Sequence, residues 1–205
     1  MADIVLFHSV FGLRPVEIAA ADRLRAAGHR VLAPDLYAGL SAVTIADGFA
    51  LADRIGWATI TGRARDAVRE LPGGAVLAGI SMGASVVEAL LPTRRQTAGV
   101  LVWHGLAEIT TTVRPGLPVQ VHIADPDEYF PADRVAAFHK VARGAGAAVE
   151  VFTYPGAGHF YTDATLPDHD GPASDLTWQR SLRFLGGVSA SAPADVPDHG
   201  TGNGS

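Results

Sequence analysis

Six short apolar segments alternate with longer stretches of helical spacing, and this alternation limits the possible folds more than any other feature. The apolar segments cover residues 4–7, 31–33, 75–80, 99–103, 119–124 and 148–153. Continuous apolar runs of this length are typical of strands buried on both faces. Strands that alternate with helices indicate a parallel sheet, covered by helices on both sides. We therefore expect an α/β fold with a doubly wound sheet of about six mainly parallel strands.

The stretches between these segments predict the helices. Helical spacing is found over residues 15–27, 61–71, 82–91, 131–143 and 176–185. Glycine or proline follows several of these segments, as expected where a helix ends. Residues 37–48 are polar and contain glycine, and we assign no element to them.

The chain has 205 residues, a length that suits one domain. From Gly186 onward it contains no aromatic residue, leucine or isoleucine, so this end cannot bury enough apolar surface to order itself. The expected organisation is a domain over residues 1–186 and a flexible C-terminal tail over residues 187–205.

Composition excludes several classes of function. The chain has no cysteine, which excludes disulfides, thiolate metal sites and a cysteine nucleophile. The net charge of −5 implies no basic face, so nucleic acid is not an expected partner. No apolar run is long enough for a membrane span, and the start lacks the pattern of a secretory signal. We expect a cytoplasmic protein with no membrane partner.

No cofactor or metal is expected either. His159 and Asp163, and the run from Asp168 to Asp170, bring together residue types that bind metals, but without the helical spacing of a zinc site. The glycines around Ser81 lack the spacing of a dinucleotide-binding fingerprint.

A candidate nucleophile lies in Gly79-Ile80-Ser81-Met82-Gly83, which matches the pattern G-x-S-x-G. The predicted strand 75–80 enters this motif and the predicted helix from residue 82 leaves it. Such a tight turn exposes the serine hydroxyl above the sheet, and the glycines remove side chains that would clash there. The other interpretation is an ordinary strand–helix connection with a serine cap. The strand–helix context favours the nucleophile.

A serine nucleophile needs a base. In hydrolases whose serine lies on a strand–helix turn of this kind, the chain order is serine, then acid, then histidine. His159 follows the last predicted strand in the glycine-rich segment 154–160, and is the candidate base; His169 is the alternative. The acid should follow the strand 119–124. Both Asp125 and Asp127 lie there, and the residues alone leave the choice between them open.

The oxyanion that forms during acyl transfer is usually bound by two backbone amides. One follows the nucleophile and the other lies in the loop after the first strand. These rules point to the amides of Met82 and Val10. Aromatic residues near these loops are candidates for a substrate pocket, and we single out Phe11, Trp103, Phe160 and Tyr161.

Four segments together resemble the dienelactone hydrolase family of α/β-hydrolases. They are the segment from Val10-Phe11-Gly12 to the sequence APDLYAG at residues 33–39, the motif around Ser81, the acid loop at 125–131, and the histidine loop at 154–160. The resemblance implies an α/β-hydrolase-like sheet in the order 2-1-3-4-5-6, lacking the usual first two antiparallel strands. Aligning Pro131 with the proline of the family's acid loop implies that Asp127 is the acid.

Three positions depart from the family pattern. Dienelactone hydrolases proper use a cysteine where this chain has Ser81, and a glutamate where it has Ser9. They also place an arginine after the histidine, near Asp163 here, and a carboxylate there would disfavour an anionic substrate. The expected function is a serine hydrolase of a small, neutral ester or lactone, acting through an acyl-enzyme. The alternatives are a non-catalytic ligand-binding relative, or a hydrolase of thioester, amide or C–C bonds.

Overall fold

The computed structural model describes residues 1–110 and 113–191. In these residues a single sheet contains six strands in the order β2-β1-β3-β4-β5-β6, and every neighbouring pair is parallel. The strands are β1 Asp3–Phe7, β2 Arg30–Leu32, β3 Val76–Ile80, β4 Val100–Trp103, β5 Leu117–Asp125 and β6 Ala147–Pro155. The predicted fold class and strand order are confirmed.

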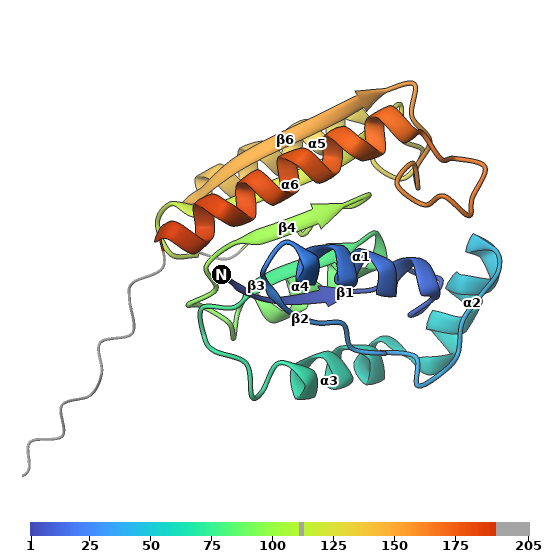
Figure 1. Ribbon diagram of the computed structural model, residues 1–205, viewed down its shortest axis with the longest axis horizontal. Coiled ribbons are helices and arrows are strands. Elements are labelled where there is room, and N and C mark those ends of the chain that lie inside the picture. Colours follow the sequence, from blue (N-terminus) through green and yellow to red (C-terminus); the bar gives the residue numbers. More distant parts are fainter. Residues whose placement is uncertain (111–112, 192–205) are drawn as a thin grey trace, which may run out of the picture.

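Helices cover both faces of the sheet (Figure 1). They are α1 Pro15–Ala26, α2 Ile45–Ile55, α3 Trp57–Ala67, α4 Met82–Leu90, α5 Ala132–Gly144 and α6 Gly171–Ser191. α1 and α6 lie on one face, where the Arg23 guanidinium of α1 stacks on the Trp178 ring of α6 at 4.5 Å. α4 and α5 lie on the other face.

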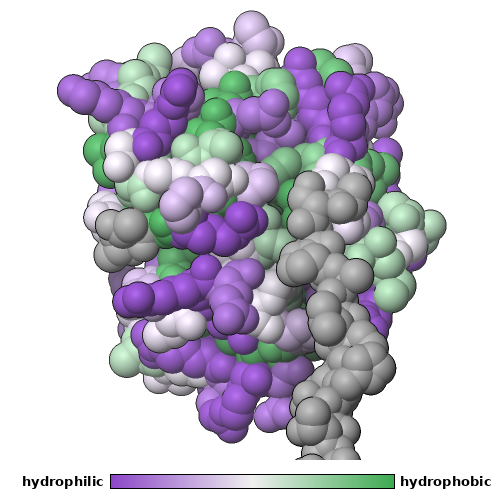
Figure 2. Space-filling view, turned by 90° about the vertical axis from the view of Figure 1, so that its left-hand side faces the viewer, coloured by the Kyte–Doolittle hydropathy of each residue, from purple (hydrophilic) through white to green (hydrophobic). Residues whose placement is uncertain are grey.

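The core explains why the central strands are continuous apolar runs. β3 is buried along its whole length, and so is β4, because each has strands on both sides and helices on both faces. At the amino ends of the strands, hydrophilic side chains cover most of the surface (Figure 2). None of the helices in the described ranges is both long and apolar enough to cross a membrane.

Helix α2 lies mostly where the sequence suggested no element. Thr44 caps it, because the Thr44 hydroxyl accepts a hydrogen bond of 3.1 Å from the Asp47 amide. Its apolar residues Ile45, Phe49, Ala52 and Ile55 recur at helical spacing, so the sequence carries a second signal besides the cap, and the prediction missed this helix. α3 begins at Trp57, four residues before the predicted start, because Gly56 ends α2 with a positive φ and the next helix follows at once.

The C-terminal end also differs from the expectation. α6 continues to Ser191, beyond the expected domain boundary at residue 186, and Val188 is buried in the core. A small apolar side chain on the inner face of a helix suffices to hold this extra turn. The rest of the expected tail, residues 192–205, lies outside the described residues.

Candidate active site

The loops at the carboxyl ends of the strands carry the candidate residues. Because all six strands are parallel, these loops meet at one edge of the sheet. Ser81 follows β3, Asp127 follows β5 and His159 follows β6. Residues far apart in the sequence are therefore neighbours at this edge.

Ser81 lies at the apex of a strained turn. Its φ of 50° and ψ of −110° are unusual for a residue with a side chain. The turn is tight on both sides: a Cβ on Gly79 would lie 2.4 Å from the Gly83 carbonyl, and one on Gly83 would lie 2.4 Å from the Phe7 carbonyl oxygen. Only glycine fits at either position, as the motif predicts.

A chain of hydrogen bonds connects Ser81 to a buried carboxylate. The Ser81 Oγ lies 3.2 Å from His159 Nε2, and His159 Nδ1 lies 2.8 Å from Asp127 Oδ2. The other Asp127 oxygen accepts hydrogen bonds from the amides of Tyr129 and Phe130. With both oxygens engaged, Asp127 holds Nδ1 as the donor, which leaves Nε2 to accept the Ser81 hydroxyl proton.

The alternatives considered from the sequence lie elsewhere. Asp125 ends β5 with an exposed side chain, and its carbonyl oxygen accepts a hydrogen bond from the Gly156 amide. His169 is exposed in the loop before α6. Neither has a recorded contact with Ser81 or His159 in the described part of the chain.

Two further residues position the loop of His159, and neither role was predicted from the sequence. The Asp168 carboxylate accepts a hydrogen bond of 3.1 Å from the Phe160 amide. His104 follows β4, and its Nε2 lies 2.7 Å from the Thr162 hydroxyl. Burial lowers the pKa of His104 well below the ordinary value, so this imidazole stays neutral beside His159.

The loop after β1 presents the Val10 amide. His8 Nδ1 lies 2.7 Å from the Ser9 carbonyl oxygen, and His8 Nε2 accepts a hydrogen bond from the Leu36 amide. The Ser9 carbonyl therefore faces His8, and the Val10 N–H, on the other side of the same trans peptide, points away from it. The amides of Val10 and Met82 have no hydrogen-bond partner within the described residues.

A cavity of about 280 Å³ opens beside Ser81 and His159. Most of its lining is apolar, with two charged groups, Glu88 and Arg134. Burial raises the pKa of Glu88 and outweighs the hydrogen bond from the Glu108 amide, which lowers it. The remaining lining residues are Val10, Ile45, Phe49, Met82, Ser85, Leu106, Tyr129, Phe130 and Phe160.

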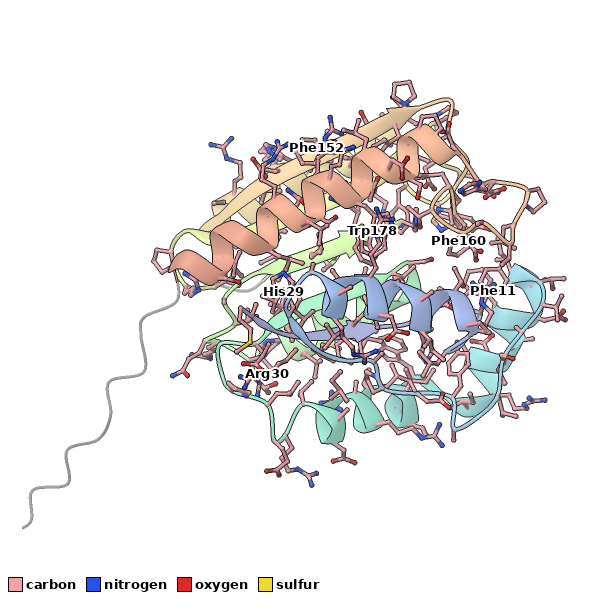
Figure 3. The ribbon with its side chains drawn as sticks, viewed as in Figure 1. Phe11, His29, Arg30, Phe152, Phe160 and Trp178 are labelled. Atoms are coloured by element: carbon pink, nitrogen blue, oxygen red, sulfur yellow. The ribbon has the colours of Figure 1, made fainter. Side chains whose placement is uncertain are left out.

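Of the four aromatic residues predicted for the pocket, Phe160 lines this cavity. Trp103 instead lines a second cavity, of about 170 Å³, which residues of α1 and α6 also line. Phe11 is buried against Phe160, with ring centroids 5.2 Å apart (Figure 3). Tyr161 is buried and its hydroxyl lies 2.8 Å from that of Thr177. Ile45 and Phe49 were not expected, since α2 was not predicted.

The two remaining departures from the family pattern have partners inside the protein. The Ser9 hydroxyl donates to Glu17 at 2.7 Å, and Asp163 accepts a hydrogen bond of 2.7 Å from Arg14. Asp163 lines the second cavity and not the one beside Ser81. The structure therefore gives no basis for the expected repulsion between Asp163 and an anionic substrate. Within the described ranges, no three histidine, aspartate or glutamate residues gather as a metal would require.

Comparison with known families agrees with this architecture. The model of the dienelactone hydrolase family matches residues 2–189. The chain belongs to the dienelactone hydrolase family. No curated protein sequence matches it significantly.

Solved structures of this family and of esterases share the fold. A putative dienelactone hydrolase from Klebsiella pneumoniae is 18% identical, with a TM-score of 0.73, over 91% of this chain and 87% of that one. A dienelactone hydrolase-like promiscuous phosphotriesterase from metagenomic libraries is 20% identical, with a TM-score of 0.72, over 92% and 87%. A thermophilic esterase from Thermogutta terrifontis, solved with propionate, is 17% identical, with a TM-score of 0.62, over 94% and 85%.

Proposed function

We propose that this member of the dienelactone hydrolase family is a serine hydrolase that cleaves a small ester or lactone. One observation carries the proposal: Ser81 stands on a strained turn with its Oγ 3.2 Å from His159 Nε2, while His159 Nδ1 lies 2.8 Å from the buried Asp127. A serine hydroxyl becomes an effective nucleophile only beside an oriented base of this kind.

In the first half of the proposed reaction, Ser81 Oγ attacks the ester carbonyl carbon and its proton passes to His159 Nε2. Asp127 stabilises the resulting imidazolium and does not itself take the proton. The amides of Val10 and Met82 donate hydrogen bonds to the carbonyl oxygen as it becomes negative. When the tetrahedral intermediate collapses, His159 returns the proton to the departing alcohol oxygen, which leaves an acyl group on Ser81.

In the second half, water takes the place of the alcohol. His159 removes a proton from the water as its oxygen attacks the acyl carbon. The second tetrahedral intermediate then expels Ser81 Oγ, which recovers its proton from His159. The products are a carboxylic acid and free enzyme, and for a lactone both product groups lie on one molecule.

The lining of the 280 Å³ cavity supports a small substrate with apolar groups. Eight of its lining residues have uncharged apolar or aromatic side chains: Val10, Ile45, Phe49, Met82, Leu106, Tyr129, Phe130 and Phe160. The volume is at the lower end of ligand pockets, which suits short acyl chains.

Hydrolysis of short-chain nitrophenyl esters by the native chain and by Ser81→Ala tests the proposal. We expect turnover by the native chain and a loss of about 10³-fold or more in Ser81→Ala. A fluorophosphonate should label the native protein at Ser81. Equal activity of the two proteins would refute the role of Ser81. Absence of both turnover and labelling would favour a ligand-binding relative, and a panel of thioesters and amides tests other bonds.

A further inference from the structure

One guanidinium connects the two loops on which the proposed chemistry depends. Arg14 lies between β1 and α1 with its side chain largely buried. Its Nη2 donates to Glu17 Oε1 at 2.9 Å and to Asp163 Oδ2 at 2.7 Å, and its Nε donates to Glu17 Oε2 at 3.2 Å. Glu17 belongs to α1, whereas Asp163 follows His159 by four residues, so the contacts bridge distant parts of the chain.

On one side, Glu17 reaches into the loop that presents Val10. The Ser9 hydroxyl donates to the Glu17 carboxylate at 2.7 Å and accepts a hydrogen bond from the Phe11 amide at 3.3 Å. Ser9 and Phe11 are the two neighbours of Val10. Their contacts therefore fix the backbone on both sides of the Val10 amide, whose direction the proposed oxyanion site requires.

On the other side, Asp163 closes the turn that begins at Phe160, the residue after His159. Its amide donates to the Phe160 carbonyl at 2.8 Å, and its Oδ1 accepts hydrogen bonds from both the amide and the hydroxyl of Thr165. With Oδ1 engaged by Thr165, Oδ2 receives Arg14. The guanidinium thereby holds this turn against the loop after β1.

Packing between aromatic rings reinforces the same connection. The Arg14 guanidinium stacks over the Phe11 ring at 4.2 Å, and Phe11 contacts the ring of Phe160. Figure 3 shows Phe11 and Phe160 on facing loops at the same end of the molecule. Phe160 follows His159 directly, so this contact also bears on the position of the base.

The opposite charges of Arg14 and its two carboxylate partners stabilise this bridge. Glu17 and Asp163 are both buried, at 2% and 4% exposure. Burial alone would lower the pKa of Arg14, but the hydrogen bonds and charges of the two carboxylates outweigh it and raise the pKa. A planar fork that donates in two directions suits this bridge, and the single ammonium of lysine does not reproduce it.

We propose that Arg14 is a positioning residue for hydrolysis: its bridge between Glu17 and Asp163 sets the loop carrying Val10 against the loop carrying His159. Arg14, Glu17 and Asp163 do not line the 280 Å³ cavity, so they act through the loops and not on the substrate. The inference rests on the proposed function, since it concerns the same Ser81 chemistry. It predicts effects on transition-state stabilisation more than on substrate binding.

Kinetics of Arg14→Met with a nitrophenyl ester and its thiono analogue test the inference. A thiocarbonyl is a poorer hydrogen-bond acceptor, so the ratio of ester to thionoester turnover reports on the oxyanion donors. We expect kcat to fall about 10- to 100-fold with KM within about twofold, because a small misplacement of donors weakens mainly the transition state. The ester-to-thionoester ratio should fall as well, and Arg14→Lys should recover part of the loss.

The matched control is Arg30→Met, which removes an exposed arginine paired with Asp3 at the opposite end of the sheet. It should keep native kcat and the native ratio. A merely structural role for Arg14 would lower the melting temperature and leave both kinetic readouts unchanged in the folded variant, which would overturn the inference. If Arg14→Met does not fold, Arg14→Lys and Asp163→Asn decide, and native kcat in both would overturn it.

The two proposals fail in distinguishable ways. Native turnover that depends on Ser81, together with unchanged kinetics in the Arg14 variants, would overturn the positioning role alone. Absence of Ser81-dependent turnover in the native chain would overturn the proposed function, and the positioning role with it.

Discussion

Asp127 and Asp125 stand two residues apart in one loop, yet only Asp127 contacts His159. In the proposed mechanism Asp127→Asn keeps the shape of the side chain but can hold the imidazole in the wrong tautomer. Such a change should lower kcat by about 10³- to 10⁴-fold. Asp125→Asn, at an exposed position, should retain native kcat. Steady-state kinetics of the two variants check this, and a greater loss in Asp125→Asn would contradict the assignment.

Gly83 is a second residue at which a small change, the addition of one methyl group, should have a measurable effect on stability. A Cβ there would lie 2.4 Å from the Phe7 carbonyl oxygen, and neither backbone segment can move without displacing β1 or α4. We expect Gly83→Ala to lower the free energy of unfolding by about 1–3 kcal/mol, as overpacking does. The measurement is urea denaturation.

Gly62 provides the matched control, because a Cβ there meets nothing within 4 Å and the residue lies inside α3. Gly62→Ala should raise the free energy of unfolding by about 0.5–1 kcal/mol, since alanine loses less backbone entropy in a helix. If both variants shifted the urea midpoint in the same direction, the steric account of Gly83 would be wrong.

At the scale of whole elements, α2 supplies one wall of the cavity beside Ser81. Phe49 lines that cavity and is 50% exposed, and its ring lies 6.4 Å from that of Tyr129. In Phe49→Ala we expect KM for aromatic esters to rise about three- to tenfold with little change in kcat, since apolar contact is lost and the reacting groups are untouched.

Trp57→Ala is the control for α2, because Trp57 is similarly exposed, at 45%, but lies on α3 and does not line the cavity. It should leave KM unchanged. A panel of phenyl and alkyl esters run on the three proteins distinguishes the outcomes. Equal effects of the two substitutions would show that Phe49 acts through general stability and not through substrate contact.

The elements differ in how well the sequence predicts them, and the difference has a physical reason. β1, β3 and β4 are buried on all sides, so they must be continuous apolar runs and are visible as such. α2 carries two local signals, the cap at Thr44 and apolar residues at helical spacing, yet it was not predicted. Gly48 in its middle weakens the helical signal, and only tertiary packing explains this glycine, because a Cβ there would lie 2.7 Å from the Val10 carbonyl oxygen.

The candidate site shows the same division. The motif and chain order pointed to Ser81 and His159, and the family resemblance favoured Asp127 over Asp125. The structure brings the side chains of Ser81, His159 and Asp127 within hydrogen-bond distance. Their catalytic roles stay predictions. The residues that hold the loops, Asp168 and Arg14, were not predicted. Asp168 binds the Phe160 amide eight residues earlier in the same loop, at a spacing typical of no motif, and Arg14 reaches Asp163 in a distant segment of the chain.

At the scale of the whole molecule, the interior holds neutral histidines that make folding sensitive to acid. His122 lies on β5 with Nδ1 2.8 Å from the Tyr154 hydroxyl and Nε2 2.9 Å from Gln120 Oε1. The first contact suits an acceptor nitrogen and the second a donor, so the neutral ring satisfies both. Burial, and secondarily the charge of Arg180, lower the pKa of His122 to about 3 from its ordinary 6.5.

The sign of the effect follows from linkage. Between pH 6.5 and about 3 the unfolded chain protonates this histidine and the folded chain does not, so stability falls as the pH falls through that window. Below pH 6, the buried His122 should lower the free energy of unfolding by about 1.4 kcal/mol for each pH unit of acidification.

His122→Gln should lose stability at pH 7, because it loses part of the hydrogen bonding, but its stability should decline less steeply on acidification. Free energies of unfolding measured from pH 7 to pH 5 for the native chain, His122→Gln and the exposed-site control His169→Gln check this. Parallel slopes in the native chain and His122→Gln would mean that other groups cause the acid sensitivity, whereas a shallower slope in His122→Gln alone assigns it to the buried ring.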